Sequence, residues 1–497
     1  MRTIDHPGRP RAVRGAMGLA LVALLSGCML GPDYKRPELS VPTKFRDNAL
    51  LAGASATAAD TAWWQRFGDP QLDALVTEAL ANNQDIVAAA ARVDQFYGAL
   101  GTTRSALFPQ FGAQVTDTRT RASELTITPA PGTNPFNSAQ ANLLASWEID
   151  LFGRTRRLTE AAVAELQASE AARRGTILSV VSAVINGYVT LRELDQQVDV
   201  TRNTVQLRKD TLTLFEKRFR GGVVSELELN QARSEYAAGL RALPQLEQAR
   251  AQQENALSNL VGRNPGPIAR GKTIGELVLP LVPAGLPSDL LERRPDVLQA
   301  EQSLVAANAR IGAAKAAYFP SISLTGAFGG ASRSLSDVSK GAARLWTYGV
   351  DVNLPIFTAG AIAGQVQSAE AAQRASLAQY RKAVQAAFGE TENALVGVTE
   401  SVKSRDASKM QADALSNYAR LARKRYEGGY SSYLEVMDAD RSLFNAQLQY
   451  VDAQAAVLFQ ATALYKSMGG GWVNLANKEA AQPAFQVSEK AAPTAAR

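Results

Sequence analysis

The chain contains two copies of one structural plan, and this internal duplication constrains its fold more than any other feature. Phe108-Pro109 recurs 211 residues later as Phe319-Pro320, and the run 218–222 recurs 207 residues later as 425–429. A Pro- and Gly-rich connector, 263–288, separates the copies. Solenoid repeats have periods of roughly 20 to 50 residues. The much longer period here indicates two copies of one larger unit.

After each Phe-Pro pair the hydrophobic period changes from helical to alternating. In the first copy Phe111, Ala113 and Val115 alternate with polar neighbours, and the second copy alternates in the same way. Segments of about ten residues with one polar and one apolar face are typical of membrane β-barrels. We therefore predict β-hairpins at about 108–152 and about 319–357. The alternative is a water-soluble antiparallel sheet with one face on a core.

Each alternating region precedes a long tract that favours helix. Proline is absent from 136–243 and from 356–482, and both tracts are rich in Ala, Gln, Glu, Leu and Arg. Apolar residues recur at every seventh position between Leu191 and Phe219, which is typical of a coiled-coil seam. A Gly-Gly pair then interrupts each tract. The sequence therefore predicts two long antiparallel helical hairpins per chain.

The number of strands predicts an oligomer. Two hairpins supply four strands, which cannot close a barrel, and a barrel of about eight strands is filled by its own side chains. Three chains would supply twelve strands, so a homotrimer is the smallest assembly that leaves a pore.

The start of the chain has the layout of a secretory signal. A basic stretch precedes an apolar run from Ala16 to Leu25, and Ser-Gly-Cys follows, ending at Cys28. This ending resembles a bacterial lipobox. We therefore predict that residues 1–27 are removed and that Cys28 carries a covalent lipid. The alternatives are an ordinary signal peptide with a chance cysteine, or an uncleaved anchor, although the apolar run is too short to span a bilayer.

Composition argues against an enzyme. The one histidine, His6, lies in the leader, and Cys28 is the one cysteine. Zinc sites of the Cys/His kind, Ser-His-Asp triads and Cys-His dyads are therefore unavailable to the mature chain. No basic block with interleaved aromatic residues occurs, so nucleic acid is not an expected partner. We predict no catalytic residues, no metal and no cofactor apart from the lipid on Cys28.

Several motifs together resemble the TolC-type outer membrane factors, and most closely the lipoprotein branch that serves RND-type multidrug efflux. The motifs are Gly-Pro-Asp-Tyr-Lys-Arg-Pro at 31–37, Trp-Glu-Ile-Asp-Leu-Phe-Gly-Arg at 147–154 and Arg-Arg-Pro-Asp at 293–296. The resemblance covers nearly the whole mature chain, up to about Asn477.

The resemblance implies an α-helical protein with membrane β-strands. It implies a trimeric twelve-stranded β-barrel continuous with a twelve-helix α-barrel, and a mixed α/β equatorial domain. The expected organisation is signal peptide, lipid-anchored N-terminal segment, repeat 1, connector, repeat 2, and C-terminal segment with a disordered tail. The expected bounds are 1–27, 28–68, 69–262, 263–288, 289–470 and 471–497.

The implied function is passive conduction of small molecules across the outer membrane of a Gram-negative bacterium. An inner-membrane RND-type pump and a periplasmic adaptor would deliver them. Two alternatives stay open: the outer-membrane conduit of a type I secretion system, and a lipid-anchored coiled-coil scaffold without a pore.

The resemblance also implies a periplasmic gate on the second hairpin. The gate pattern Tyr-Leu-x-x-x-Asp-Ala-x-Arg places Leu434 and Asp438 four residues apart, on one helical face. In a trimer they would form an apolar ring and an acidic ring. Glu435 and Asp440 could broaden the acidic ring. Alternatively, Leu434 is coiled-coil core, and Asp438 is a solvated charge or a partner of Arg441.

The tips of the two helical hairpins are the expected docking site for the adaptor. The residues that repeat there in both copies are Arg218, Gly221, Gly222 and Ser225, and Arg425, Gly428, Gly429 and Ser432. The alternative is that the glycines only terminate helices.

Overall fold

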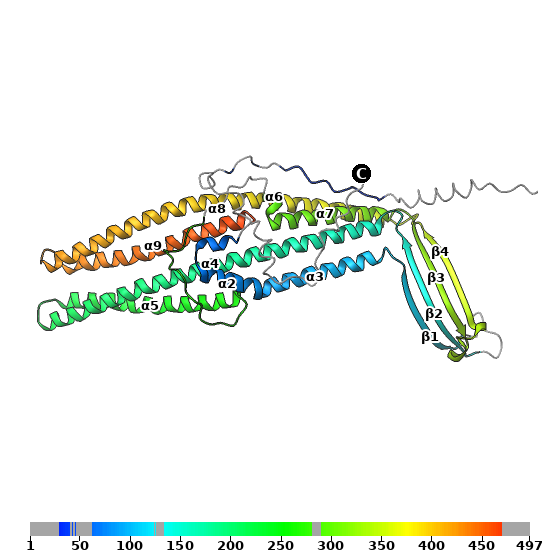
Figure 1. The fold of residues 1–497 in the computed structure, drawn as a ribbon, viewed down its shortest axis with the longest axis horizontal. Coiled ribbons are helices and arrows are strands. Elements are labelled where there is room, and N and C mark those ends of the chain that lie inside the picture. The colour runs from blue at the N-terminus through cyan, green and yellow to red at the C-terminus, as the bar shows by residue number, and fades with distance from the viewer. Residues whose placement is uncertain are drawn as a thin grey trace, which may run out of the picture. The chain divides into compact units, whose positions relative to one another are not determined.

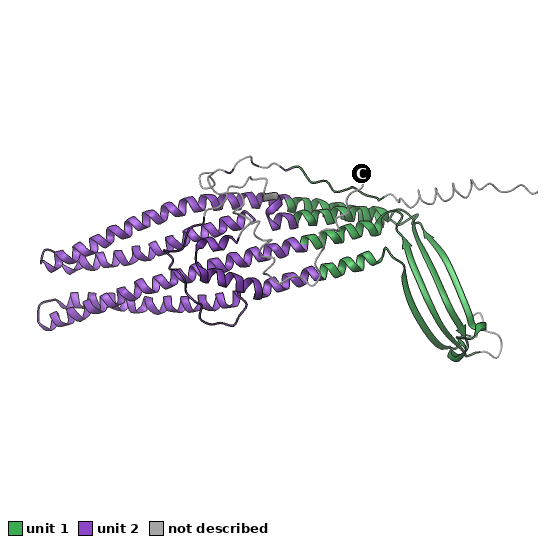
Figure 2. Ribbon diagram, viewed as in Figure 1, with its two compact units in different colours: residues 1–38, 95–168, 300–380 green, residues 39–94, 169–299, 381–497 purple. Residues whose placement is uncertain are grey.

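The computed structural model describes residues 29–39, 42, 45, 62–123, 125, 134–280 and 290–469. The chain divides into two compact units (Figure 2). Unit 1 takes residues up to Glu38, Gln95–Ala168 and Ala300–Tyr380. Unit 2 takes Leu39–Asp94, Ser169–Gln299 and the residues from Arg381 onward.

The described residues follow the same order of elements twice (Figure 1). The first series is η3 (Trp63–Phe67), α2 (Pro70–Asn82), α3 (Gln84–Ser105), β1 (Gln110–Thr120), β2 (Phe136–Ile149), α4 (Arg154–Arg220) and α5 (Glu226–Leu260). The second is α6 (Leu290–Arg293), α7 (Pro295–Ala316), β3 (Ser321–Ser332), β4 (Arg344–Asn353), α8 (Ala361–Glu427) and α9 (Tyr433–Ser467). The predicted fold class is confirmed, because each copy supplies one β-hairpin and one long helical hairpin.

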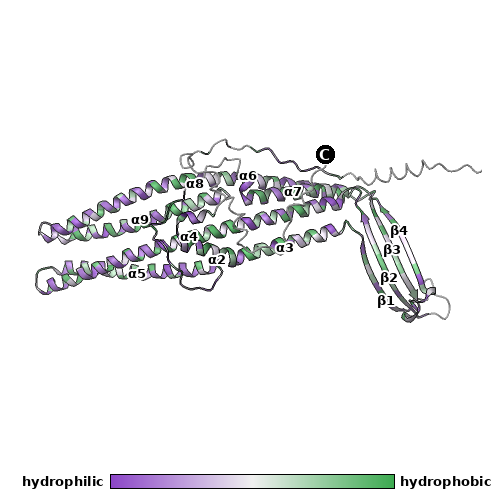
Figure 3. Ribbon diagram, viewed as in Figure 1, coloured by the Kyte–Doolittle hydropathy of each residue, from purple (hydrophilic) through white to green (hydrophobic). Residues whose placement is uncertain are grey.

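The four strands form one antiparallel sheet in unit 1, in the order β1-β2-β3-β4. The register places Ala113, Leu143, Phe328 and Trp346 in one row across the strands. Side chains of residues that are paired across neighbouring strands point to the same face of the sheet. These apolar residues therefore gather on one face. Hydrophobic and hydrophilic residues both occur along the strands (Figure 3). Trp346 is 66% exposed, so this apolar face does not fit a soluble sheet that packs on a core.

The long helices of the two copies match in length. α4 and α8 each have 67 residues, and α5 and α9 each have 35. Outside the sheet, the described segments 62–69 and 263–280 form a 3-10 helix and turns rather than strands.

The main core of unit 2 gathers around Trp63, which is fully buried and stacks on Tyr465 with ring centroids 4.5 Å apart. Residues from α2, α4, α8 and α9 and from the connector contribute to this core. Among the described helices, α4 contains a stretch long and apolar enough to cross a membrane. The part of α4 from Ile177 to Leu191 contributes many residues to the core, as expected for a packed helix.

The connector is held against α4 by a buried carboxylate. Asp69 caps the start of α2 by accepting a hydrogen bond from the Gln71 backbone (2.9 Å). It also accepts hydrogen bonds from the Tyr188 hydroxyl (2.7 Å) and from the Lys272 backbone (2.9 Å). One side chain thus ties together α2, α4 and the segment that joins the two copies.

A buried carboxyl group in unit 2, that of Glu193, makes the stability of the fold depend on pH. Burial raises the pKa of Glu193 on α4 to about 7, and the neighbouring Asp452 on α9 adds to the shift. Gln197 donates a hydrogen bond to Asp452 at 2.6 Å. The pKa of Glu193 is about 7 in the folded state and 4.5 ordinarily. Between pH 4.5 and 7 the folded state therefore holds a proton on Glu193 that the unfolded chain has lost. The contribution of Glu193 to stability should therefore be fully present below pH 4.5 and be lost as pH rises through about 7.

We expect Glu193→Gln to remove most of this pH dependence, because the amide cannot ionise. Denaturant midpoints followed by helical circular dichroism at acidic and mildly alkaline pH would measure the effect. Glu400→Gln is the matched control, because Glu400 lies in an exposed pair with Lys403. An equal pH slope in the parent protein and in Glu193→Gln would contradict this account.

Candidate functional site

The tips of the two helical hairpins have the same backbone geometry. Two residues after the end of α4 lies a glycine with positive φ, Gly222 (+70°), and its repeat counterpart Gly429 (+78°) follows α8 in the same way. The Val223 N–H donates to the Arg218 carbonyl (2.9 Å), and the Tyr430 N–H donates to Arg425 (2.8 Å). These bonds close the last helical turn in the manner of a Schellman motif. The second glycine of each pair is therefore required by the turn itself.

The two tips pack against each other within one chain. Phe215 of the first hairpin contacts Tyr433 of the second, with ring centroids 4.3 Å apart. The guanidinium of Arg218 lies 5.6 Å from the ring centroid of Tyr426 and donates a hydrogen bond to its hydroxyl at 2.5 Å. Small and apolar residues, including Ala419 and Val436, fill the space between the hairpins. Arg218 is thus a link between the hairpins in this structure.

The helix starts at the two tips differ. Ser225 forms a complete capping box with Glu228: the Ser225 N–H donates to the carboxylate (2.9 Å), and the Glu228 N–H donates to the hydroxyl (3.3 Å). Ser432 has the same position and spacing but makes no side-chain cap. Its partner Glu435 instead lies 3.7 Å from Arg425. The first turn of α9 therefore lacks a constraint that the first turn of α5 has.

A groove of about 400 Å³ lies at the tip of the second hairpin. Its lining residues come from the end of α8, the turn and the start of α9: Tyr418, Leu421, Ala422, Lys424, Arg425, Tyr430 and Glu435. Leu421 is 50% exposed, and Tyr430 is more exposed still. Arg425 is among the residues that the repeated motifs predict, whereas Tyr418 and Leu421 are not. The available signal was the repeat itself, because Leu214 and Val223 stand at the positions of Leu421 and Tyr430 and are also exposed.

Leu434 and Asp438 lie on the exposed face of α9. Leu434 is 60% exposed, whereas Val436 on the opposite face is 1% exposed and packs between the hairpins. Leu434 therefore adds nothing to the core of the helical hairpin. Asp438 lies one turn further on and accepts a hydrogen bond from Arg441 at 3.0 Å, with both side chains exposed.

The expectation that Asp440 broadens an acidic ring is wrong for this chain. Asp440 faces α8, where it accepts hydrogen bonds from Arg423 at 2.9 and 3.2 Å. Burial raises the pKa of Asp440, although the guanidinium of Arg423 opposes the shift. Asp438 and Asp440 are two residues apart on a helix, so their side chains point to different faces. Glu435 is likewise drawn toward Arg425.

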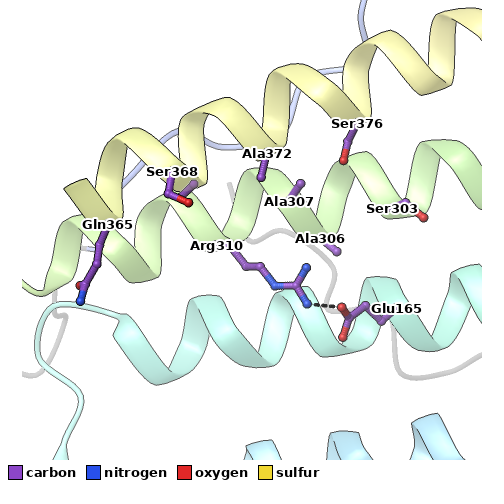
Figure 4. Close-up of a pocket in the computed structure, with 10 residues that line it drawn as sticks. Glu165, Ser303, Ala306, Ala307, Arg310, Gln365, Ser368, Ala372 and Ser376 are labelled. Atoms are coloured by element: carbon purple, nitrogen blue, oxygen red, sulfur yellow. Dashed lines mark hydrogen bonds and ion pairs between the residues drawn. The ribbon is translucent and has the colours of Figure 1, made fainter. Parts of the chain in front are cut away.

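A second groove, of about 480 Å³, lies between α4, α7 and α8 in unit 1 (Figure 4). Its polar groups are serine hydroxyls, the Gln365 amide and an ion pair between Arg310 and Glu165. Among the residues that the structure describes, no group of three or more His, Cys, Asp or Glu side chains is placed to hold a metal ion. Cys28, the predicted lipidation site, lies outside the described residues, as does the segment 471–497.

Comparison with known proteins gives consistent matches. The family model "Outer membrane efflux protein" matches residues 75–263 and 286–470. The chain is 35% identical to the probable efflux pump outer membrane protein TtgC of Pseudomonas putida, over 92% of this chain and 96% of the relative. It is 33% identical to the cation efflux system protein CusC of Escherichia coli, over 90% and 96% respectively.

Solved structures show the same fold. The outer-membrane channel OprN superposes with a TM-score of 0.80 at 27% identity, covering 90% of this chain and all of that one. The open state of the MtrE outer membrane channel of Neisseria gonorrhoeae gives 0.79 at 30% identity, covering 90% of this chain and 99% of that one.

Proposed function

The chain belongs to the outer membrane efflux protein family, and we propose that three copies of it form one wall around a water-filled channel. It is an efflux protein of the outer membrane and not an enzyme. The relatives do not favour a type I secretion conduit or a scaffold without a pore, because their names describe efflux pump proteins and their structures are channels.

The open sheet carries this proposal. β1 and β4 are its edge strands, and the apolar face between them is exposed. Backbone N–H and C=O groups on a free edge cannot be satisfied by lipid, so a sheet in a membrane has to close. Pairing β1 of one chain with β4 of the next closes it, and the antiparallel order of the strands permits that contact. With four strands per chain, three chains give the twelve-stranded wall.

Disulfide cross-linking should test this closure. We expect Gln114→Cys on β1, combined with a cysteine at Thr347, Gly349 or Asp351 on β4, to give covalent trimers on oxidation. The control pair Ser146→Cys with Thr325→Cys should close within one chain, because these residues are direct partners on β2 and β3. If the control pair cross-links while no β1–β4 pair joins subunits, the proposed wall is wrong.

We propose that the channel receives small molecules from an inner-membrane RND-type pump through a periplasmic adaptor. Relatives that are about equally similar to this chain are named after different substrates. One TtgC, at 35% identity, is named for toluene, and CusC, at 33%, is named for cations. A passive channel needs no selective pocket, so the pump is expected to set the substrate class.

We propose that Leu434 and Asp438 form the periplasmic gate. Three-fold symmetry would place three copies of each exposed side chain around the axis, as an apolar ring and an acidic ring. The uncapped start of α9 supports a gate at this point, because this first turn has fewer side-chain constraints than that of α5. Arg441 would partly neutralise the acidic ring through its bond to Asp438.

We propose that the adaptor docks on the hairpin tips, with the groove around Leu421 and Tyr430 as its main contact. The groove combines exposed apolar side chains with the cations Lys424 and Arg425. Such a surface suits an amphipathic helical hairpin that carries acidic residues at its rim. Gly221 and Gly222, and their counterparts Gly428 and Gly429, would shape the tips rather than contact the adaptor.

We also propose that a covalent lipid on Cys28 anchors the mature chain to the outer membrane. The repeats at 69–262 and 289–470, flanked by segments 28–68, 263–288 and 471–497, remain our proposed domain organisation.

A further inference from the structure

We propose that each contact between neighbouring subunits in the wall of strands binds the phosphate group of a lipid from the outer leaflet of the membrane. We call this contact, between β1 of one chain and β4 of the next, the seam. The phosphate would bind to Arg119 and Arg121 of one subunit and to Arg333 and Arg344 of its neighbour. The inference rests on the proposed closure of the sheet into a trimeric wall, because one chain alone supplies half of each site.

The end of the sheet that carries these arginines faces the exterior. The connections to α3, α4, α7 and α8 all lie at one end of the strands, and both hairpin turns lie at the other end (Figure 1). The helices of an outer membrane efflux protein are periplasmic, so the hairpin turns lie at the outer leaflet. Arg119 and Arg121 lie at the end of β1, Arg333 directly follows β3, and Arg344 begins β4. All four are therefore at the outer end.

Arg119 and Arg344 lie on the lipid-facing side of the sheet, beyond its apolar residues. Arg344 and Val352 are an even number of residues apart on β4, as Phe111 and Arg119 are on β1, so each pair points to one face. Each pair spans eight residues, which is roughly 26 Å along the strand. The apolar band of an outer-membrane barrel is about 25 Å tall. Strand tilt reduces the height, and the long arginine side chains extend the rest of the way to the headgroups.

The guanidinium groups at this end have no acidic partner within the described part of the chain. All four arginines are exposed, and none forms an ion pair with a residue that the structure describes. Lys340, the other cation of the β3–β4 loop, pairs with Asp337 at 2.6 Å. The carboxylates that remain in the sequence of the two turn regions are Asp117 and Glu124. Four arginines against two carboxylates leave this end of each chain positively charged.

The loop between β3 and β4 keeps its two arginines close together. Two short 3-10 turns order the loop. Gly330 of β3 pairs with Arg344 of β4, and a Cβ atom at Gly330 would overlap the Val338 carbonyl, so the loop lies tightly against the end of the sheet. Arg333 is three residues beyond Gly330, roughly 10 Å along the chain. The side chains of Arg333 and Arg344 can therefore converge on one anion.

Closing the wall brings arginines of two chains together. β1 and β4 are opposite edges of the sheet, so they meet only across a seam. With Gln114 opposite residue 347, 349 or 351, the three pairings of the cross-linking experiment, Arg344 lies opposite residue 117, 119 or 121 of the next chain. Residues 119 and 121 are arginines, and opposite Asp117 the nearest diagonal neighbour is Arg119. Like charges opposite each other on paired strands are destabilising, and an anion between them relieves the repulsion.

A lipid phosphate is the anion that this surface fits. Guanidinium groups bind phosphate oxygens through paired N–H bonds, and basic clusters at a membrane surface bind phosphorylated headgroups. The apolar face of the sheet begins directly beside the arginines, with Trp346 66% exposed two residues from Arg344. Acyl chains of the bound lipid would lie on that face. The arginines and the apolar residues therefore suit the two parts of one phosphorylated lipid.

Native mass spectrometry of the purified full-length trimer tests the site. The probes are lipid A with both phosphates, the same lipid with its phosphates removed, and inorganic phosphate. We expect up to three molecules of the phosphorylated lipid per trimer and much weaker binding of the dephosphorylated form. Arg119→Gln combined with Arg344→Gln should weaken binding by about 30-fold, as expected for the loss of two cations beside an anionic headgroup.

Arg92→Gln with Arg374→Gln is the matched control. It removes two exposed arginines from α3 and α8, outside the sheet, and should leave lipid binding unchanged. Equal affinities of the two double variants would overturn the site, as would equal binding of the lipid with and without its phosphates. Release of the bound lipid by an equal concentration of inorganic phosphate would overturn the assignment to a lipid, because a free anion would then suffice.

The same experiment separates this proposal from the closure on which it rests. The mass of the complex reports the trimer, and the cross-links between β1 and β4 report the seam. A closed trimer without phosphate-dependent lipid binding would refute the lipid site alone, whereas failure of every β1–β4 pair would refute both. If the double variant does not assemble, Arg344→Lys keeps the charge but loses the planar pair of donors. It should bind the phosphorylated lipid more weakly than the parent, and equal binding would count against the site.

Discussion

A trimer in which Leu434 and Asp438 are both alanine is expected to pass ions at least about two-fold better than the parent protein in planar bilayers. Both side chains are exposed on α9, one turn apart. Removing the leucines takes away the apolar constriction that resists wetting. Removing the aspartates releases Arg441 and makes the aperture less cation-selective, so the reversal potential in a salt gradient should shift as well.

The control for this experiment is a pair of the same chemistry on another helix. Met410→Ala with Asp413→Ala removes an exposed apolar residue and an exposed carboxylate, paired with Lys409, from α8. Conductance of this control should equal that of the parent. If the gate variant assembles as a trimer and conducts no better than the control, Leu434 and Asp438 do not form the constriction.

Replacing Leu421 by aspartate is expected to weaken adaptor binding by about 30-fold or more, which corresponds to a hot-spot loss of about 2 kcal/mol. Leu421 lines the groove at the tip of the second hairpin, between Tyr418 and Arg425 on α8. A carboxylate there would lose its hydration when the adaptor covers it. Titration of the purified trimer with the adaptor of its cognate pump would measure the dissociation constant.

Met410→Asp is the matched variant for this test. Met410 is more exposed than Leu421 and lies three turns earlier on the same helix, outside the groove. It adds the same charge without reaching the proposed contact, so adaptor affinity should hardly change. Equal affinities of the two aspartate variants would place the docking surface elsewhere.

The fold could be predicted from the sequence because its main elements are marked by residues close together in the chain. These marks are the repeated motifs, the alternation of polar and apolar residues in the strands, and the glycines that end the long helices. The alternation nevertheless does not fix where one strand ends: β3 continues through Gly329 and Gly330, where the apolar side chains of the pattern stop. Gly329 pairs with Asn142, and a Cβ there would overlap the Ala141 carbonyl. Glycine at this position reflects a close approach between strands, which a single strand's sequence does not reveal.

The position of proline does not predict the extent of α5 either. The helix passes through Pro244 and continues to Leu260, although the Pro-free tract ends at residue 243. A proline disfavours a helix interior but does not always end a helix that is held by its neighbours. Here α5 packs against α4 on both sides of Pro244, for example through Leu229 and Leu257.

The candidate sites were predicted less completely than the fold. Spacing placed Leu434 and Asp438 on one face of a helix, and the structure exposes both. The inward pairing of Asp440 with Arg423 depends on the partner helix and could not be read from spacing. The same holds for the buried Arg157, which donates hydrogen bonds to Leu30, Gly31 and Asp33, more than 120 positions earlier in the chain.

The equal lengths of α4 and α8, and of α5 and α9, restrict how this protein can change during evolution. A single inserted residue in one long helix would rotate everything beyond it by about 100° and shift it by 1.5 Å. The rings of Phe215 and Tyr433 would then no longer lie against each other. Insertions and deletions should therefore survive mainly as matched changes in both members of a helical hairpin, in both halves of the gene, and in multiples of seven residues.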